Sequence, residues 1–129
     1  MADPVRVALV DDDLSVRRAL KRLLSSAGFE AHVFASAREL LDSGFGDEAG
    51  CFVLDIHLGR VSGFDLLKEL RLAGSKVPAI FITAFEDDAS RARARELGAS
   101  FLRKPFEGSV LLEAIAAAVE GSPGGDGTA

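Results

Sequence analysis

The sequence predicts an α/β domain with a central parallel sheet, because short apolar runs alternate with helical patterns along almost the whole chain. Most of the runs lack the in/out alternation of a half-exposed strand, as is typical of parallel strands buried on both faces. The predicted strands are residues 5–10, 31–34, 51–54, 79–83 and 100–102. The predicted helices begin near Leu14, Ala37, Gly63, Asp87 and Glu107.

Five strands in strict alternation with five helices predict three layers, with helices on both faces of the sheet. Crossovers between parallel strands are right-handed, so few topologies remain, and the doubly wound, flavodoxin-like order 2-1-3-4-5 is the natural choice. We expect one domain over residues 1–120. The last segment, residues 121–129 with the sequence GSPGGDGTA, is predicted to be a flexible tail or linker.

The first predicted helix carries one apolar stripe, which predicts that it packs on the sheet. The stripe consists of Val16, Leu20, Leu23, Leu24 and Ala27. Gly28 follows as the expected residue after the helix C-cap. The basic residues point elsewhere and are interpreted chiefly as a solvated face; they are Arg17, Arg18, Lys21 and Arg22.

The composition is that of a globular protein and argues against several classes. The 129 residues are 48% hydrophobic and 27% charged, enough for one packed domain. The net charge of −5 argues against binding nucleic acid through bulk positive charge. No helix-turn-helix is recognised, so no DNA binding is expected from this chain. The single cysteine, Cys51, fits a reducing compartment and is interpreted as a small buried hydrophobe.

The N-terminal residues lack the basic segment and apolar run of a signal peptide. No apolar stretch approaches the roughly 18–20 residues that a membrane span needs. We therefore expect a soluble, cytoplasmic protein with no membrane association.

Polar side chains stand at the carboxyl ends of four predicted strands. In chain order they are Asp11, Asp12, Asp13, Asp55, Thr83 and Lys104. Ligands of open α/β sheets bind at this edge, near the switch in strand order. We therefore expect carboxylates, a hydroxyl and an ammonium group in one crevice.

Such a cluster suits phosphoryl transfer. Crowded carboxylates raise one another's pKa, and Mg²⁺, which prefers oxygen ligands, relieves their repulsion. An ionised aspartate can act as the nucleophile and form an aspartyl phosphate. Simpler interpretations stay open for single residues: Asp13 is expected to cap the first helix, Asp55 alone could be a turn residue, and Lys104 alone could lie on the surface.

Four sequence blocks together resemble the receiver domains of bacterial two-component response regulators, the CheY-like superfamily. The blocks are VALVDDD at 7–13, FVLDIHLGRVSGFDLL at 52–67, FITA at 81–84 and FLRKPF at 101–106. The resemblance covers residues 5 to about 120 and looks closest to nitrogen-fixation and nitrate-type regulators. It implies a signalling switch that catalyses its own phosphorylation and dephosphorylation, with a sensor histidine kinase or a phosphotransfer protein as partner.

The resemblance also implies the metal site and the phosphoacceptor. Asp55 is implied to be the phosphoacceptor. Asp11 and Asp12 are implied to organise Mg²⁺ together with Asp55, with Asp12 as a direct ligand. The main-chain carbonyl of His57 is implied as a further metal ligand.

The remaining implied roles concern switching. Thr83 is implied to be the switch hydroxyl, Phe101 the switch aromatic and Lys104 the cation that contacts the phosphoryl group. Pro105 is expected to follow a cis peptide bond. Output, including a homodimer contact, is expected at the surface of the fourth helix, the fifth strand and the fifth helix. The arginines of the fourth helix, Arg91, Arg93 and Arg95, are interpreted chiefly as a solvated face.

Two positions depart from the family pattern. Gly59 stands where a proline is usual, which predicts a more flexible loop over residues 58–61. Phe101 stands at the switch position in place of a tyrosine and lacks the hydroxyl that a tyrosine could hydrogen-bond, so switching there must depend on packing alone. His57 and Phe85 occupy positions that tune hydrolysis in the family, and the bulky Phe85 is predicted to exclude the attacking water.

Two other functions share features with this sequence. A hydrolase of the haloacid-dehalogenase kind needs a second aspartate two residues after the nucleophile, where this sequence has His57. A receiver-like interaction module that is not phosphorylated usually lacks one or more site residues, and all five positions are filled here. The kinase is expected to dock near the first helix and the loop after the fifth strand.

Overall fold

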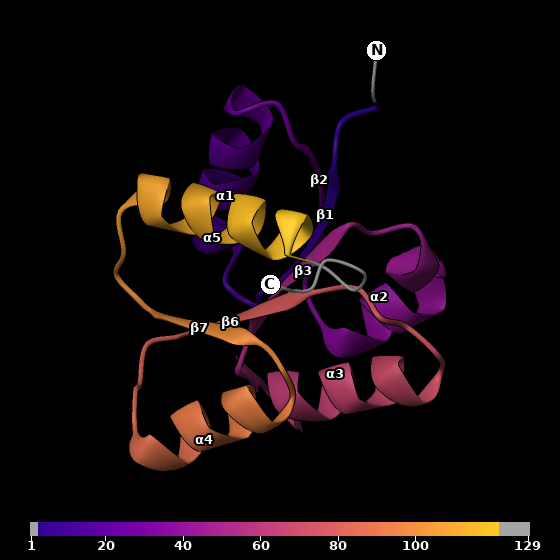
Figure 1. Cartoon of the computed structure of the whole chain (residues 1–129), viewed down its shortest axis with the longest axis vertical. Helices are drawn as coiled ribbons and strands as arrows, with labels where there is room; N and C mark the ends of the chain where they lie inside the picture. The colour runs from indigo at the N-terminus through magenta and orange to yellow at the C-terminus, as the bar shows by residue number, and fades with distance from the viewer. Residues whose placement is uncertain (1–2, 122–129) are drawn as a thin grey trace.

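A five-stranded parallel sheet lies between two layers of helices in the computed structural model, which describes residues 3–121 (Figure 1). The strand order is β2-β1-β3-β6-β7, and every neighbouring pair is parallel. Since β6 and β7 are the fourth and fifth strands of this sheet in chain order, the predicted order 2-1-3-4-5 is confirmed. The predicted tail, apart from Gly121, lies outside the described residues.

The sheet strands fall within a residue or so of their predicted ranges. They are β1 (Arg6–Val10), β2 (Glu30–Phe34), β3 (Cys51–Asp55), β6 (Ala79–Thr83) and β7 (Ser100–Arg103). Asp55 is thus the last residue of β3 rather than the residue after it. The ladder reaches past it, because the backbone N–H of Ile56 donates to the carbonyl of Ile82 at 3.0 Å.

The five predicted helices all form and begin within one residue of the predicted positions. They are α1 (Leu14–Ser26), α2 (Ala37–Ser43), α3 (Gly63–Leu72), α4 (Asp88–Glu96) and α5 (Gly108–Glu120), with a short 3₁₀ turn, η1 (Phe45–Asp47). Asp13 caps α1 as expected, since its side chain accepts from the backbone N–H groups of Ser15 and Val16. Gly28 follows α1 at a φ of +94°, a conformation that glycine adopts without strain.

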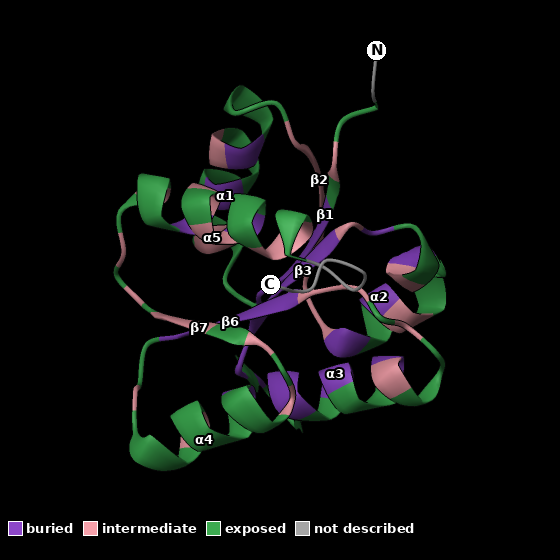
Figure 2. Cartoon of the chain, in the orientation of Figure 1, coloured by how far each residue is buried: buried purple, intermediate pink, exposed green. Residues whose placement is uncertain are grey.

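The core has two halves, one on each face of the sheet (Figure 2). Alternate residues of a strand face opposite sides, so β3 supplies Phe52 and Leu54 to one half and Cys51 and Val53 to the other. Helices α2, α3 and α4 cover the first half, and α1 and α5 cover the second. Among residues 3–121, no helix is long and apolar enough to cross a membrane.

A small antiparallel hairpin was not predicted. Strands β4 (His57–Leu58) and β5 (Val61–Ser62) pair directly after β3, joined by Gly59 and Arg60. Gly59 has a φ of +79°, which suits glycine at the first turn position and which the fixed ring of a proline cannot adopt. The segment 58–61, which was expected to be a more flexible loop, therefore belongs to a short antiparallel hairpin.

Candidate functional site

The carboxyl ends of four neighbouring strands carry the predicted site residues. Asp11 follows β1, Asp55 ends β3, Thr83 ends β6 and Lys104 follows β7. Thr83 and Lys104 are held side by side, because the backbone N–H of Lys104 donates to the carbonyl of Thr83 at 2.7 Å. The peptide bond between Lys104 and Pro105 is cis, as expected.

Three aspartates form a compact cluster at this edge. Asp11, Asp12 and Asp55 each offer a carboxylate oxygen, and these oxygens lie within 4.8 Å of one another. Asp11 and Asp55 are buried, whereas Asp12 is exposed to solvent. Carboxylates of this number and spacing suit a hard divalent cation that keeps some of its water ligands.

Lys104 supplies a positive charge inside the cluster. Its Nζ lies 2.8 Å from Oδ2 of Asp11 and 3.6 Å from Oδ2 of Asp55. Burial alone would lower the pKa of Lys104, but the hydrogen bond to Asp11 and the charge of Asp55 raise that pKa above its ordinary value. The ammonium group is therefore held in its charged form beside the acidic oxygens.

One ammonium group does not neutralise three carboxylates. Burial raises the pKa of Asp55 above its ordinary value. The negative charges of Asp11 and Asp12 add to this, while the backbone N–H of His57, which donates to Oδ1 of Asp55 at 3.1 Å, and the charge of Lys104 oppose it. The pKa of Asp55 is thus raised chiefly by burial and further by the neighbouring carboxylates, whereas the pKa of Lys104 is raised by the carboxylates alone. A bound cation would offset the excess negative charge of the cluster.

Two supporting residues escaped the sequence prediction. Nη1 of Arg17 donates to the carbonyl of Asp11 at 2.8 Å, so this half-buried residue holds the turn before α1 and does not belong to a purely solvated face. Gly63 opens α3 directly against the end of β3. A Cβ at Gly63 would lie 2.4 Å from the carbonyl oxygen of Asp55, so only glycine fits.

Thr83, Phe85 and His57 lie together next to the acidic cluster. Thr83 is fully buried, and its Oγ1 accepts from the backbone N–H of Phe85 at 3.1 Å. The Phe85 side chain is 71% exposed and meets the His57 ring edge to face, with centroids 5.9 Å apart. The His57 side chain is exposed, as expected. His57 and Phe85, the two residues predicted to tune hydrolysis, therefore contact each other through their rings at the surface.

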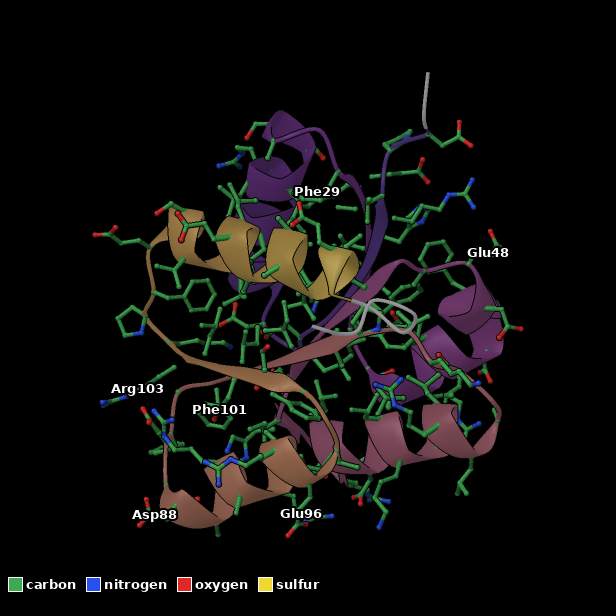
Figure 3. The ribbon with its side chains drawn as sticks, viewed as in Figure 1. Phe29, Glu48, Asp88, Glu96, Phe101 and Arg103 are labelled. Carbon is green, nitrogen blue, oxygen red and sulfur yellow. The ribbon has the colours of Figure 1, made fainter. Side chains whose placement is uncertain are left out.

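Phe101 is half-buried on β7 and faces α4 (Figure 3). The guanidinium carbon of Arg91 lies 5.5 Å from the centre of the Phe101 ring, and Arg91 also pairs with Glu86. Arg93 stands 5.0 Å from the ring of Phe64 on α3. Both arginines are exposed, as the interpretation of a solvated face expects, and each also contacts an aromatic ring of a neighbouring element.

Cys51 and His32, which were expected to be structural, lie away from the acidic cluster. Cys51 is a free, fully buried cysteine, and burial raises the pKa of its thiol to about 12. His32 on the edge strand β2 hydrogen-bonds Glu30 at 2.6 Å and stacks on Phe45, with ring centroids 4.1 Å apart.

The fold and the site define a doubly wound α/β domain with an acidic cluster and a lysine at the carboxyl edge of its sheet. The chain belongs to the response regulator receiver domain family, whose model matches residues 7–116. It is thus a signalling switch of the two-component type. Receiver domains use Mg²⁺ at an acidic pocket, and the cluster of Asp11, Asp12 and Asp55 is one that can hold a metal.

Individual relatives agree with this family. Nodulation protein W of Bradyrhizobium diazoefficiens is 44% identical over 115 residues, which are 88% of this chain and 51% of that protein. Full-length FixJ from B. japonicum superposes with a TM-score of 0.85 at 33% identity, over 95% of this chain and 61% of that one. A CheY-like receiver domain protein from Methanospirillum hungatei JF-1 shares the fold, with a TM-score of 0.82 at 24% identity over 91% of this chain and 94% of that chain. The chain spans about half the length of the curated relatives it matches.

Proposed function

We propose that Asp55 accepts a phosphoryl group from a sensor histidine kinase or a phosphotransfer protein in a Mg²⁺-dependent step. The observation that carries the proposal is the cluster itself, in which oxygens of Asp11, Asp12 and Asp55 lie within 4.8 Å of one another beside Nζ of Lys104. We assign residues 1–120 to the receiver domain and residues 121–129 to a tail or linker. The protein acts in the cytoplasm and has no DNA-binding role of its own in this proposal.

The metal would be held by Asp11, Asp12, Asp55 and the main-chain carbonyl of His57. A bound Mg²⁺ supplies positive charge that offsets the charge of the phosphoryl oxygens. The donor set fits, because all the proposed ligand atoms are oxygens and the cluster holds an excess of negative charge. Arg17 supports this set by fixing the backbone that carries Asp11.

The transfer step follows from the positions of the side chains. A carboxylate oxygen of Asp55 attacks phosphorus in line with the leaving nitrogen of a partner phosphohistidine. The new P–O bond forms as the P–N bond breaks, and the departing imidazole takes up a proton. Lys104 contacts a phosphoryl oxygen and offsets its charge. Water later hydrolyses the aspartyl phosphate and restores the carboxylate.

Phosphorylation then biases the output surface. The Thr83 hydroxyl turns from the backbone N–H of Phe85 toward the phosphoryl group, which leaves space into which Phe101 turns. This shifts a pre-existing equilibrium of α4, β7 and α5, the surface proposed for output and for a homodimer. Arg91, Arg95 and Arg103 are exposed on this surface.

A hollow beside Lys104 supports docking of the phosphodonor on α1 and the loop after β7. Its volume is about 370 Å³, and it is lined by Val16, Ala19, Leu20, Lys104, Pro105 and Phe106. The lining is mostly apolar, and α1, which contributes three of the lining residues, also carries the basic residues Arg17, Arg18, Lys21 and Arg22. A helix of a partner with an apolar face and acidic rim would suit both features.

Mass spectrometry after incubation with acetyl phosphate and Mg²⁺ tests the chemistry. The wild type is expected to gain one phosphoryl group, and Asp55→Asn none, because the amide is not a nucleophile. Beryllofluoride with Mg²⁺ is a second probe, and we expect it to bind the wild type. A chain that neither gains a phosphoryl group nor binds beryllofluoride would be an interaction module instead.

The tuning role of Phe85 has its own test. Phe85 is apolar and stands beside the site, so we propose that it keeps the attacking water away from the aspartyl phosphate. Phe85→Asp is expected to speed self-dephosphorylation, which is followed as loss of the phosphorylated species after removal of acetyl phosphate. Val61→Asp adds the same charge at another exposed apolar position and should change the rate less. Equal rates in the wild type and Phe85→Asp would remove Phe85 from this role.

A further inference from the structure

A second hollow lies at the opposite edge of the sheet, where β6 and β7 begin. Its volume is about 400 Å³ and its lining comes from the ends of α3 and α5, the loop after α4 and the starts of the two strands. We call it the basal hollow; its lining includes Arg71, Lys76, Pro78, Leu97, Ser100 and Ala118. None of its lining residues is acidic, although the whole chain carries a net charge of −5.

Arg71 is the unusual member of this lining. Its Nη1 donates to the carbonyl of Val77 at 2.6 Å and more weakly to the carbonyl of Ser75 at 3.4 Å, which holds the loop after α3. The side chain is half-buried, and this burial lowers the pKa of the guanidinium below its ordinary value. Within residues 3–121, no carboxylate lies within ion-pair distance of it.

The contrast with Lys104 shows what Arg71 lacks. Lys104 is also half-buried, but it has the carboxylates of Asp11 and Asp55 as partners. Charges that are removed from water are usually paired when they are fully buried, and partial burial of Arg71 carries part of the same cost without a counter-charge. Holding the loop uses only Nη1, so Nε and Nη2 of Arg71 have no acceptor among the described residues.

We propose that the basal hollow binds a small organic carboxylate, with Arg71 and Lys76 facing the carboxylate and the apolar part against Pro78, Leu97 and Ala118. The planar guanidinium matches the two oxygens of a carboxylate, and Lys76 adds a second positive charge. The volume lies within the range of small-molecule pockets. This site is separate from Asp55 and does not depend on phosphorylation.

The carboxylate has two sources that the test distinguishes, a free acid or an acidic residue that follows Gly121, which is one of the lining residues. The nearest such residue is Asp126, outside the described residues. If Asp126 supplied the carboxylate, Asp126→Asn would tighten the binding of a free acid by removing a competitor. An unchanged affinity in Asp126→Asn would assign the hollow to a free acid.

Titration of the full chain with sodium benzoate, followed by ¹H–¹⁵N NMR, tests the proposal. We expect saturable shifts at the amides of Ser75, Lys76, Gly98 and Ser100, with none of this pattern from benzylamine, which has the same ring and the opposite charge. Arg71→Lys should weaken benzoate binding about tenfold or more, since the planar fork is lost. Lys76→Gln should weaken it by roughly threefold, whereas Lys68→Gln, the same change on an exposed part of α3 outside the hollow, should not.

Because Arg71 also holds a loop, a variant that leaves its charge in place is needed. Ala118→Leu fills the hollow with an apolar side chain and should abolish the shifts while leaving Arg71 and Lys76 intact. Thermal unfolding of each variant shows whether it folds. Benzylamine shifts as large as those of benzoate, or equal benzoate affinity in the wild type, Lys76→Gln and Ala118→Leu, would overturn the proposal.

Discussion

Helices α3 and α4 lie side by side on the same face of the sheet, but they are attached to it by different forces. Five residues of α3 are buried, Gly63, Phe64, Leu66, Leu67 and Leu70. Helix α4 buries Ala94 alone. Two of its arginines contact the rings of Phe64 and Phe101, and Arg91 also pairs with Glu86 just before the helix.

This difference in packing agrees with the roles that the two helices have in the proposed cycle. Helix α3 opens against the backbone of Asp55, so its packing holds the acceptor in place. Helix α4 belongs to the proposed output surface, and the free energy needed to move it must not exceed a few kilocalories per mole. Cation–π contacts are worth about 0.5–1 kcal/mol each at exposed sites, against about 2–5 kcal/mol for a buried leucine, so α4 is the helix that can be released.

Truncating one contact in each helix tests this comparison most directly. Leu67→Ala should lower the free energy of unfolding by about 3 kcal/mol, because Leu67 is fully buried. Arg93→Met should lower it by only about 0.5–1 kcal/mol, since only the contact with the Phe64 ring is lost. Urea unfolding followed by circular dichroism measures both. Leu72→Ala, on α3 but 88% exposed, is the control and should change little; similar losses for Leu67→Ala and Arg93→Met would contradict the comparison.

The start of α3 gives a second test, with a smaller effect. Gly63→Ala should lower the free energy of unfolding by about 2 kcal/mol, because the new Cβ meets the carbonyl of Asp55 and the backbone has to shift. The same shift should slow phosphorylation of Asp55 by acetyl phosphate. Gly46→Ala is the matched control, since its nearest neighbour is the flexible end of Leu70 at 3.1 Å. Unchanged stability and phosphorylation in Gly63→Ala would show that α3 does not fix the acceptor.

The sequence predicted most of this fold because the buried strands leave an unambiguous pattern. Strands β1, β3 and β6 are almost wholly buried and appear in the sequence as continuous apolar runs. The hairpin of β4 and β5 was missed, because two-residue strands leave no periodicity. Its only sequence signal is Gly59, at a turn position where glycine is favoured.

The gathering of Asp11, Asp12, Asp55 and Lys104 was also predictable, because strand order decides which strand ends are neighbours. The roles of these residues remain proposals. The contacts of arginines with distant partners could not be predicted. Arg91, Arg93 and Arg95 are all exposed residues of the same type on one helix, and only the packing of α4 against α3 and β7 brings Arg91 and Arg93 over aromatic rings.

Weakening a single contact of α4 is a finer test of whether α3 and α4 are held by different forces. Arg91→Met keeps an apolar stem over Phe101 but removes the charge that meets the ring and pairs with Glu86. Hydrogen exchange of the α4 amides should quicken by about threefold, the equivalent of one contact of this strength, while α3 amides keep their rates. Arg95→Met, on the same helix, should leave both helices unchanged. Equal acceleration in α3 and α4 would mean that the two helices open together.

The N-caps of the two helices predict the smallest effect, a difference between α3 and α4 in how their stability depends on pH. Asp87 caps α4, and the hydrogen bond from the backbone N–H of Ser90, reinforced by the Ser90 side chain, lowers the pKa of Asp87 below its ordinary value of 3.8. Helix α3 is capped by the hydroxyl of Ser62, which does not titrate, and the Asp65 carboxylate adds only a long bond of 3.4 Å from the backbone N–H of Ser62. Because the pKa of Asp87 is lower in the folded chain, its stabilisation is complete above pH 3.8 and is lost as the pH falls through the folded value.

We therefore expect the exchange rates of α4 amides, taken as a ratio to those of α3, to rise on acidification below pH 3.8. The ratio cancels the intrinsic pH dependence of exchange and any loss of stability shared by both helices. Asp87→Asn keeps a capping side chain without an acid and should make the ratio flat. If the ratio rises equally in the wild type and Asp87→Asn, the acid sensitivity of α4 comes from elsewhere, and its N-cap is no weaker than that of α3.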